Sequence, residues 1–147
     1  MNASCSHWFV KLVSCERKLE VNRLTFVTAD SCRPRLERLT QLLISAFPGS
    51  TVYQHTELFH VPHDVLNHRV DAVFLEVEKD KPSSLDCMKM LHRQKTDVPV
   101  FIVSKNEDFR EEAGKAGANG YFVLLDSEQQ LLDAIRLVKM RRTHPVD

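Results

Sequence analysis

Residues 70–80 read VDAVFLEVEKD, an almost unbroken apolar run that ends at Glu76 and then becomes acidic. A strand with one solvated face alternates apolar and polar residues, whereas a continuous run is typical of a strand buried on both faces. Such strands occur in parallel sheets that carry helices on each side. The stretch therefore predicts an α/β fold in which a carboxylate stands at the end of a central strand.

Apolar runs of strand length alternate with segments of helical spacing on both sides of this stretch. The expected strands are Leu24–Ala29, Thr51–Gln54, Val70–Val77, Val98–Ser104 and Tyr121–Leu125. The expected helices cover approximately residues 34–47, 62–68, 84–93, 107–116 and 127–141. Strict alternation implies right-handed crossovers and a doubly wound five-stranded parallel sheet with helices on both faces. In such a sheet the functional crevice lies at the carboxyl ends of the strands.

The composition is that of one ordinary globular domain of 147 residues, with 43% hydrophobic and 27% charged residues. The formal net charge is zero, so no overall charge attracts the protein to nucleic acid or to an anionic membrane. The cysteines form no C-x-x-C pair and follow no secretory leader, so we expect reduced thiols in a cytoplasmic protein. They are Cys5, Cys15, Cys32 and Cys87.

Three segments resemble the receiver domains of bacterial two-component response regulators. VDAVFLEVE resembles the phosphoacceptor strand, VPVFIVS the fourth strand, and EEAGKAGANGYFVLL the fourth helix and fifth strand. The pair Gly117-Ala118 followed by Gly120-Tyr121 is the most specific signature. The resemblance implies a flavodoxin-like strand order. We expect an N-terminal appendage at 1–20, a receiver-like domain at 21–142 and a C-terminal tail at 143–147.

The resemblance also implies an active site, which this sequence keeps only in part. Receivers phosphorylate an aspartate after the third strand, helped by an acidic pair that binds Mg²⁺ and by a lysine near the end of the fifth strand. Here Glu76 stands at the phosphoacceptor position, and its extra methylene displaces the carboxylate by roughly 1 Å. Thr28 and Ala29 occupy the positions of the acidic pair, which leaves Asp30 as the remaining acid, and Leu124 replaces the lysine. The pattern predicts a degenerate phosphoacceptor site.

Two positions of the family's switch are retained, the hydroxyl position at Ser104 and the aromatic position at Tyr121. One hypothesis is that Glu76 accepts a hydrogen bond from Ser104 and biases the fold toward an active-like state without phosphate. The alternative is that Glu76 is a solvated acid at a strand end. Ser104 could equally bond to nearby backbone, and Tyr121 could simply pack its ring against the sheet.

The expected function is that of a phosphorylation-independent pseudo-receiver, which is not an enzyme and uses no cofactor or metal. It would dock a signalling protein or a second copy of itself. The resemblance places the docking face on the fourth helix, fifth strand and fifth helix. The candidate residues there are Lys105, Asn106, Phe109, Glu112, Tyr121, Gln130, Asp133 and Arg136.

Two alternatives stay open. The protein could still be phosphorylated on Glu76, or on Asp30 or Glu78, with Asp30 holding Mg²⁺. Alternatively, the vacated pocket could bind a small molecule. That pocket would be lined by Thr28, Ala29, Glu76, Ser104 and Leu124.

The stretch HTELFHVPHDVLNH contains four histidines, but structural zinc sites need four fixed ligands and usually include cysteines. We interpret His55, His60, His63 and His68 as surface residues, with a pH response left open. The basic end KMRRTH suits a helix C-terminus and solvent, so we expect no nucleic acid or membrane partner.

Overall fold

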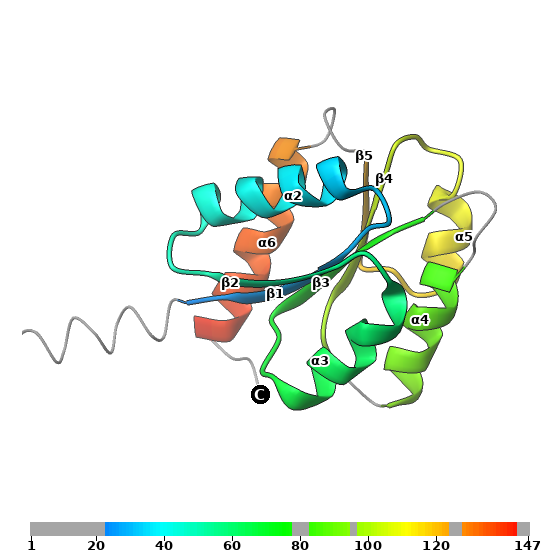
Figure 1. Cartoon of the computed structure of the whole chain (residues 1–147), viewed down its shortest axis with the longest axis horizontal. Helices are drawn as coiled ribbons and strands as arrows, with labels where there is room; N and C mark the ends of the chain where they lie inside the picture. Colours follow the sequence, from blue (N-terminus) through cyan, green and yellow to red (C-terminus); the bar gives the residue numbers. More distant parts are fainter. Residues whose placement is uncertain (1–22, 78–82, 95–96, 124–127, 144–147) are drawn as a thin grey trace, which may run out of the picture.

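The computed structural model describes residues 23–77, 83–94, 97–123 and 128–143. Its five strands form one parallel sheet in the order β2-β1-β3-β4-β5, with helices on both faces (Figure 1). The strands are β1 (Thr25–Ala29), β2 (Thr51–His55), β3 (Ala72–Glu76), β4 (Val100–Ser104) and β5 (Gly120–Val123). The helices are α2 (Arg33–Ala46), η1 (Leu58–His60), α3 (Val61–Asn67), α4 (Ser83–Arg93), α5 (Arg110–Lys115) and α6 (Glu128–Thr143). This architecture confirms the predicted doubly wound, flavodoxin-like fold.

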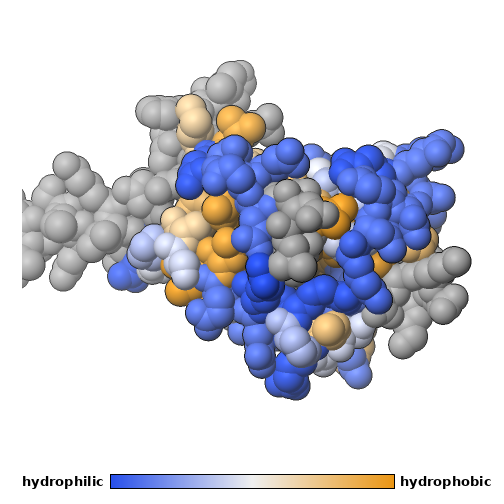
Figure 2. Space-filling model, turned by 90° about the horizontal axis from the view of Figure 1, so that it is seen from above, coloured by the Kyte–Doolittle hydropathy of each residue, from blue (hydrophilic) through white to orange (hydrophobic). Residues whose placement is uncertain are grey.

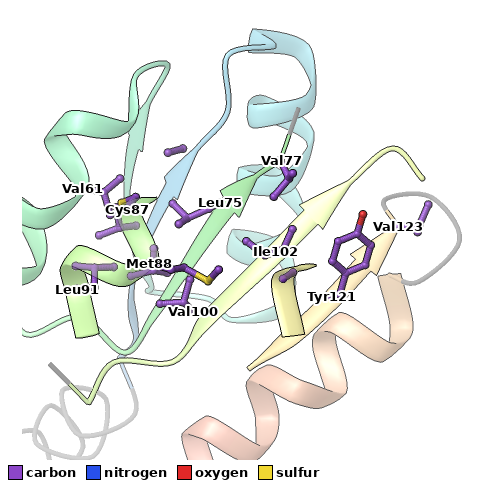
Figure 3. Packing of buried hydrophobic residues seen from close by; sticks show 14 residues of the cluster. Val61, Leu75, Val77, Cys87, Met88, Leu91, Val100, Ile102, Tyr121 and Val123 are labelled. Atoms are coloured by element: carbon purple, nitrogen blue, oxygen red, sulfur yellow. The ribbon is translucent and has the colours of Figure 1, made fainter. Parts of the chain in front are cut away.

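The sheet separates two apolar layers. On one face α2 and α6 pack against the aromatic side chains of the strands, through Leu39, Leu43, Leu131 and Ile135. On the other face α3, α4 and α5 cover a layer of mostly smaller apolar side chains, part of which is drawn in Figure 3. Its helical contributions include Val61, Met88, Leu91 and Ala113.

The strand that decides the fold lies at the centre of the sheet. All five residues of β3 are buried, as its continuous apolar sequence predicts, and β3 pairs with both β1 and β4. Ala29 pairs with Leu75, and Glu76 pairs with Val103. Each of these strands therefore ends one residue beyond its neighbour, from β1 to β3 to β4, and the side chains that follow them meet at one edge of the sheet.

Helix α5 begins at Arg110, three residues later than the sequence pattern predicts. The side-chain oxygen of Asn106 accepts a hydrogen bond from the backbone N–H of Asp108 at 3.1 Å, and Arg110 N–H donates to the carbonyl of Glu107 at 3.1 Å. These local bonds hold residues 106–109 in turns, because short polar side chains compete with helical pairing. Gly117 follows the end of the helix and adopts a left-handed conformation with φ of 98°.

Other predicted boundaries lie outside the described residues. The strand end at Leu125 and the helix start at Ser127 are among them. None of the helices in the described part of the chain is long and apolar enough to cross a membrane.

Cys87 makes stability sensitive to alkaline pH. Burial raises the pKa of its thiol to about 11, whereas a cysteine in an unfolded chain titrates near 8.5. Between these values the unfolded chain binds fewer protons than the folded one, so the free energy of unfolding should fall as pH rises. Urea unfolding of Cys87→Ala at several pH values from about 8 to about 10 should show a flatter decline than the wild type.

Cys32→Ala provides the control for this prediction, because the Cys32 thiol is only half-buried. This variant should keep the wild-type pH dependence. Equal slopes in the wild type and Cys87→Ala would show that the buried thiol does not contribute.

Candidate functional site

Two carboxylates meet at the carboxyl edge of the sheet. Asp30 directly follows β1 and Glu76 ends β3, and each residue is only 7% exposed. The backbone N–H of Asp30 donates to the carbonyl of His55 at 3.0 Å, which extends the β1–β2 ladder by one residue. The sheet register therefore fixes the position of both acids, and two buried negative charges require a partner.

Arg35, in the first turns of α2, supplies that partner. Its Nε donates to Asp30 Oδ2 at 2.7 Å, and its Nη2 donates to Asp30 Oδ1 at 2.9 Å. The same Nη2 also donates to Glu76 Oε1. The guanidinium thus forms a bidentate pair with one acid and bridges to the other, a geometry suited to arginine's planar fork of donors.

The turn that leads into α2 binds the remaining carboxylate oxygen of Glu76. The backbone N–H and the hydroxyl of Ser31 donate to Glu76 Oε2 at 2.9 and 3.1 Å. The N–H of Cys32 donates to Asp30 Oδ1 at 2.7 Å. Ser84, at the start of α4, donates its hydroxyl to the backbone carbonyl of Glu76. Both oxygens of the Glu76 carboxylate are therefore occupied as hydrogen-bond acceptors.

The Arg35 cluster is the name we give to Asp30, Arg35 and Glu76 together. Their side chains are 8%, 15% and 6% exposed. Hydrogen bonding to Asp30 is the largest cause that raises the pKa of Arg35 above its already high value, and the charges of Asp30 and Glu76 add to it. The site therefore contains a permanent cation between its two acids.

The other residues expected at this site are buried around the cluster. Thr28, Ala29 and Ser104 are 0%, 2% and 2% exposed. Within the part of the chain that the structure describes, the Thr28 hydroxyl has no hydrogen-bond partner, and the Ser104 hydroxyl accepts at 3.5 Å from the N–H of Asn106. Among the described residues, the hydrogen bonds found for Glu76 include those from Ser31, Arg35 and Ser84, and the bond found for the Ser104 hydroxyl is with Asn106, so the Ser104–Glu76 hydrogen bond stays a prediction. Leu124 lies outside the described residues.

A scan against protein-family models finds no match, and a search of curated proteins finds no relative. Solved structures do match. The signal receiver domain of an HD domain-containing protein from Pseudomonas fluorescens Pf-5 has a TM-score of 0.69 at 18% identity, over 82% of this chain and 98% of its own. A response regulator receiver domain protein from Clostridium thermocellum has a TM-score of 0.68 at 20% identity, over 82% and 97%. The chain has the fold of a response regulator receiver domain.

A third match to the receiver fold is a LuxR family DNA-binding response regulator from Silicibacter pomeroyi. Its TM-score is 0.65 at 21% identity, over 80% of this chain and 92% of that chain.

The divalent cation that a phosphorylated receiver uses does not fit the residues present here. Magnesium requires carboxylate or carbonyl oxygens with lone pairs directed at the ion. In this receiver fold Arg35 occupies both oxygens of Asp30 and one oxygen of Glu76, and Ser31 occupies the other. A second cation beside the guanidinium would also be repelled by it.

Tyr121 connects the edge strand of the receiver fold to the loop after β4. The residue is 7% exposed and belongs to the apolar layer drawn in Figure 3, where its hydroxyl points to the carboxyl edge of the sheet. That hydroxyl donates to the carbonyl of Asn106 at 2.6 Å and accepts from the N–H of Phe109 at 3.4 Å. The guanidinium of Arg110 lies 5.0 Å from the ring centroid. These contacts fix the loop in one position relative to β5.

The candidate docking residues lie on both sides of β5. Lys105 and Asn106 are exposed in the loop after β4, and Phe109 is half-buried beside them. The exposed residues of α5 and α6 are Glu112, Gln130, Asp133 and Arg136. Both helices contact β5, so these residues border the same edge of the sheet. Arg136 pairs with Asp133 at 2.9 Å, within a single helix.

The histidines form contacts in pairs. His55 Nε2 contacts Asp64 Oδ2, and the His60 ring stacks on His55 with centroids 5.1 Å apart. His68 stacks on Tyr53 at 4.5 Å. Within the described ranges, no group of three or more His, Cys, Asp or Glu side chains is arranged to hold a metal ion.

Arg35 and Ser31 are the site residues that the sequence analysis did not identify. Periodicity assigns Arg35 to the side of α2 that faces away from the core, and Ser31 reads as an ordinary turn residue. The available signal was their position, because the N-terminal turn of α2 starts at the edge where Asp30 and Glu76 end. An arginine there can reach carboxylates that its periodicity alone does not indicate.

Proposed function

We propose that this protein is a signalling module with a receiver fold that works without phosphorylation and has no phosphotransfer activity of its own. The observation that supports this proposal is the Arg35 guanidinium between Asp30 and Glu76. A phosphoacceptor needs a carboxylate oxygen available for in-line attack and a cation to neutralise the transferred group. In the Arg35 cluster the carboxylate oxygens are bonded and the cation belongs to the protein itself.

A phosphorylated receiver alternates between two charge states of its active site, with and without the phosphoryl group, whereas the Arg35 cluster has one. In a switch, a ligand shifts the population only if it binds one state better than the other. Because Arg35 neutralises the acids permanently, the phosphate-dependent difference between states is removed. The loop that follows β4 is meanwhile held by the Tyr121 hydroxyl. We infer that the protein presents its surface around β5 in a constant form.

The proposed activity of that surface is docking to a protein partner, either a signalling protein or a second copy of the chain. The supporting observation is that α5 and α6 both contact β5 and carry exposed side chains beside it. A neutral net charge does not favour nucleic acid as a partner, although one structural match is described as a DNA-binding response regulator.

The test is exposure of the full chain to beryllofluoride and Mg²⁺, a mimic of the phosphoryl group, followed by backbone amide NMR. We expect the amides of Asp30, Glu76 and Ser104 to keep their positions, because Glu76 has no oxygen available for beryllium. Fluoride alone and Mg²⁺ alone are the controls for ionic effects. A receiver domain that binds beryllofluoride, treated in parallel, verifies the reagent.

Incubation with acetyl phosphate provides the opposing measurement. A mass gain of one phosphoryl group on Glu76 or Asp30 would contradict the proposal and favour the alternative of an atypical phosphorylated receiver. Glu78, also considered as an acceptor, lies outside the described residues, and peptide mapping after the same incubation tests it equally.

A further inference from the structure

A groove of about 720 Å³ lies on the outer side of Arg35, between the first turns of α2 and the loop after β4. The volume is within the range of roughly 300–1,000 Å³ that is typical of sites for small organic ligands. Its lining includes Cys32, Pro34, Arg35, Arg38, Gln41 and Lys105. Figure 2 looks onto the side of the molecule that carries α2, where most of the surface is hydrophilic and hydrophobic residues show between the polar ones.

The lining combines apolar surface with positive charge. Pro34, the Cys32 thiol and the aliphatic stems of the long side chains provide apolar contacts, because arginine and glutamine bury their methylenes while keeping the head polar. Arg38 and Lys105 add cations, against Glu37 as the acid among the lining residues. The groove therefore suits a ligand with an apolar body and a negative group.

The two cations are available to such a ligand. Arg38 pairs with Glu128 at 2.8 Å, but the two side chains are 53% and 33% exposed, and exposed pairs contribute little. Lys105 is exposed and forms no ion pair with any residue in the described ranges. An incoming anion can therefore bind Lys105 without breaking an internal interaction.

We infer that this groove binds a small amphipathic anion, a carboxylate, sulfonate or phosphate attached to an apolar group. The inference rests on the proposed function, since it names an input that can act where phosphorylation does not. Lys105 precedes Asn106, whose carbonyl accepts the hydrogen bond from Tyr121. A ligand held by Lys105 thus contacts the loop that Tyr121 fixes, and this provides a route from the groove to the surface around β5.

Fluorescence titration with anilinonaphthalene sulfonate tests the inference, because this probe has an aromatic body and one sulfonate. We expect saturable binding to the wild type, with amide shifts in NMR at Cys32, Gln41 and Lys105. Lys105→Glu should weaken binding by about tenfold or more, and Arg38→Ala by about three- to tenfold. Lys89→Ala, an exposed lysine on α4, is the matched control and should bind like the wild type.

Two comparison probes separate the parts of the ligand. Neutral phenylnaphthylamine lacks the charge and inorganic sulfate lacks the apolar body, so each should bind at least about tenfold more weakly. Equal binding by Lys105→Glu and the wild type would overturn the inference, as would amide shifts confined to another face.

The outcomes also distinguish this inference from the proposed function. If beryllofluoride binds and Lys105→Glu loses probe binding, the groove inference stands and the proposed phosphorylation-independent function is wrong. If beryllofluoride does not bind and Lys105→Glu binds the probe like the wild type, the proposed function stands and the groove inference is wrong.

Discussion

Replacing Arg35 by methionine should lower the free energy of unfolding by about 3 kcal/mol at neutral pH. The change removes the cation from two carboxylates whose side chains are only 8% and 6% exposed. Removing one partner of a buried ion pair is far more costly than removing the pair, because the remaining charges are neither solvated nor neutralised. Urea unfolding monitored by circular dichroism measures the effect.

The companion variant restores neutrality. In Arg35→Met/Asp30→Asn/Glu76→Gln the acids become amides that need hydrogen bonds but no counterion, so most of the lost stability should return. Arg33→Met is the matched control, because Arg33 is an exposed arginine on the same turn of α2. It should change stability by less than about 0.5 kcal/mol. Equal losses in Arg33→Met and Arg35→Met would contradict the role of the cluster.

Magnesium provides a second readout on the same variants. Without Arg35, Asp30 and Glu76 would become a pair of oxygen ligands, and a divalent cation could take the place of the guanidinium. Roughly 10 mM magnesium chloride should therefore raise the stability of Arg35→Met by about 1 kcal/mol and leave the wild type unchanged. Sodium chloride at equal ionic strength controls for screening. A wild type stabilised to the same degree would show that Arg35 does not exclude the metal.

The fold could be predicted from the sequence because its main determinants are local and periodic. The continuous run at β3 indicates burial on both faces, and all five residues are buried. In α2 the helical spacing of Leu36, Leu39 and Leu43 places them on one face, and they are 4%, 4% and 0% exposed. Periodicity determines the direction of each Cβ, and that is sufficient to define which residues form the core.

The charged site could be predicted only in part, because Cβ direction does not fix the end of a long side chain. Periodicity places Asp30 and Glu76 at the edge of the sheet, where they lie. It directs Arg35 away from the core, yet the flexible arginine extends its guanidinium over the N-terminal turn to both acids. The bonds of Ser31 similarly depend on the path of the turn. These features require the relative positions of three elements, which no single segment specifies.

The start of α5 shows a second limit of local patterns. Residues 107–109 fit a helical spacing, but the side chain of Asn106 bonds to the backbone two residues ahead. The hydroxyl of Tyr121 then binds the same loop from β5. A bond from a distant strand therefore opposes a helical preference, and sequence spacing does not reveal it.

Two glycines three residues apart in and after α5 should respond to alanine with opposite signs. Gly117 has φ of 98°, in the left-handed region where a Cβ costs about 1–2 kcal/mol. An added Cβ would also stand 2.5 Å from Cε1 of His92, so that ring must move. Gly114 is helical, and its Cβ would meet nothing within 4 Å. We expect Gly117→Ala to lose about 2 kcal/mol and Gly114→Ala to gain about 0.5–1 kcal/mol in urea unfolding.

A double variant separates backbone strain from steric contact at Gly117. His92→Ala/Gly117→Ala removes the ring that the new methyl group meets, but it leaves the left-handed conformation in place. If strain dominates, the double variant should recover only the smaller, steric part of the loss after correction for His92→Ala alone. Full recovery would instead assign the effect to the ring. The helix closes through bonds from Gly117 N–H to Gly114 and from Ala118 N–H to Ala113, at 3.1 and 3.0 Å. These bonds direct the chain into β5, so a residue other than glycine at position 117 must either adopt the left-handed conformation or disrupt the turn that leads into that strand.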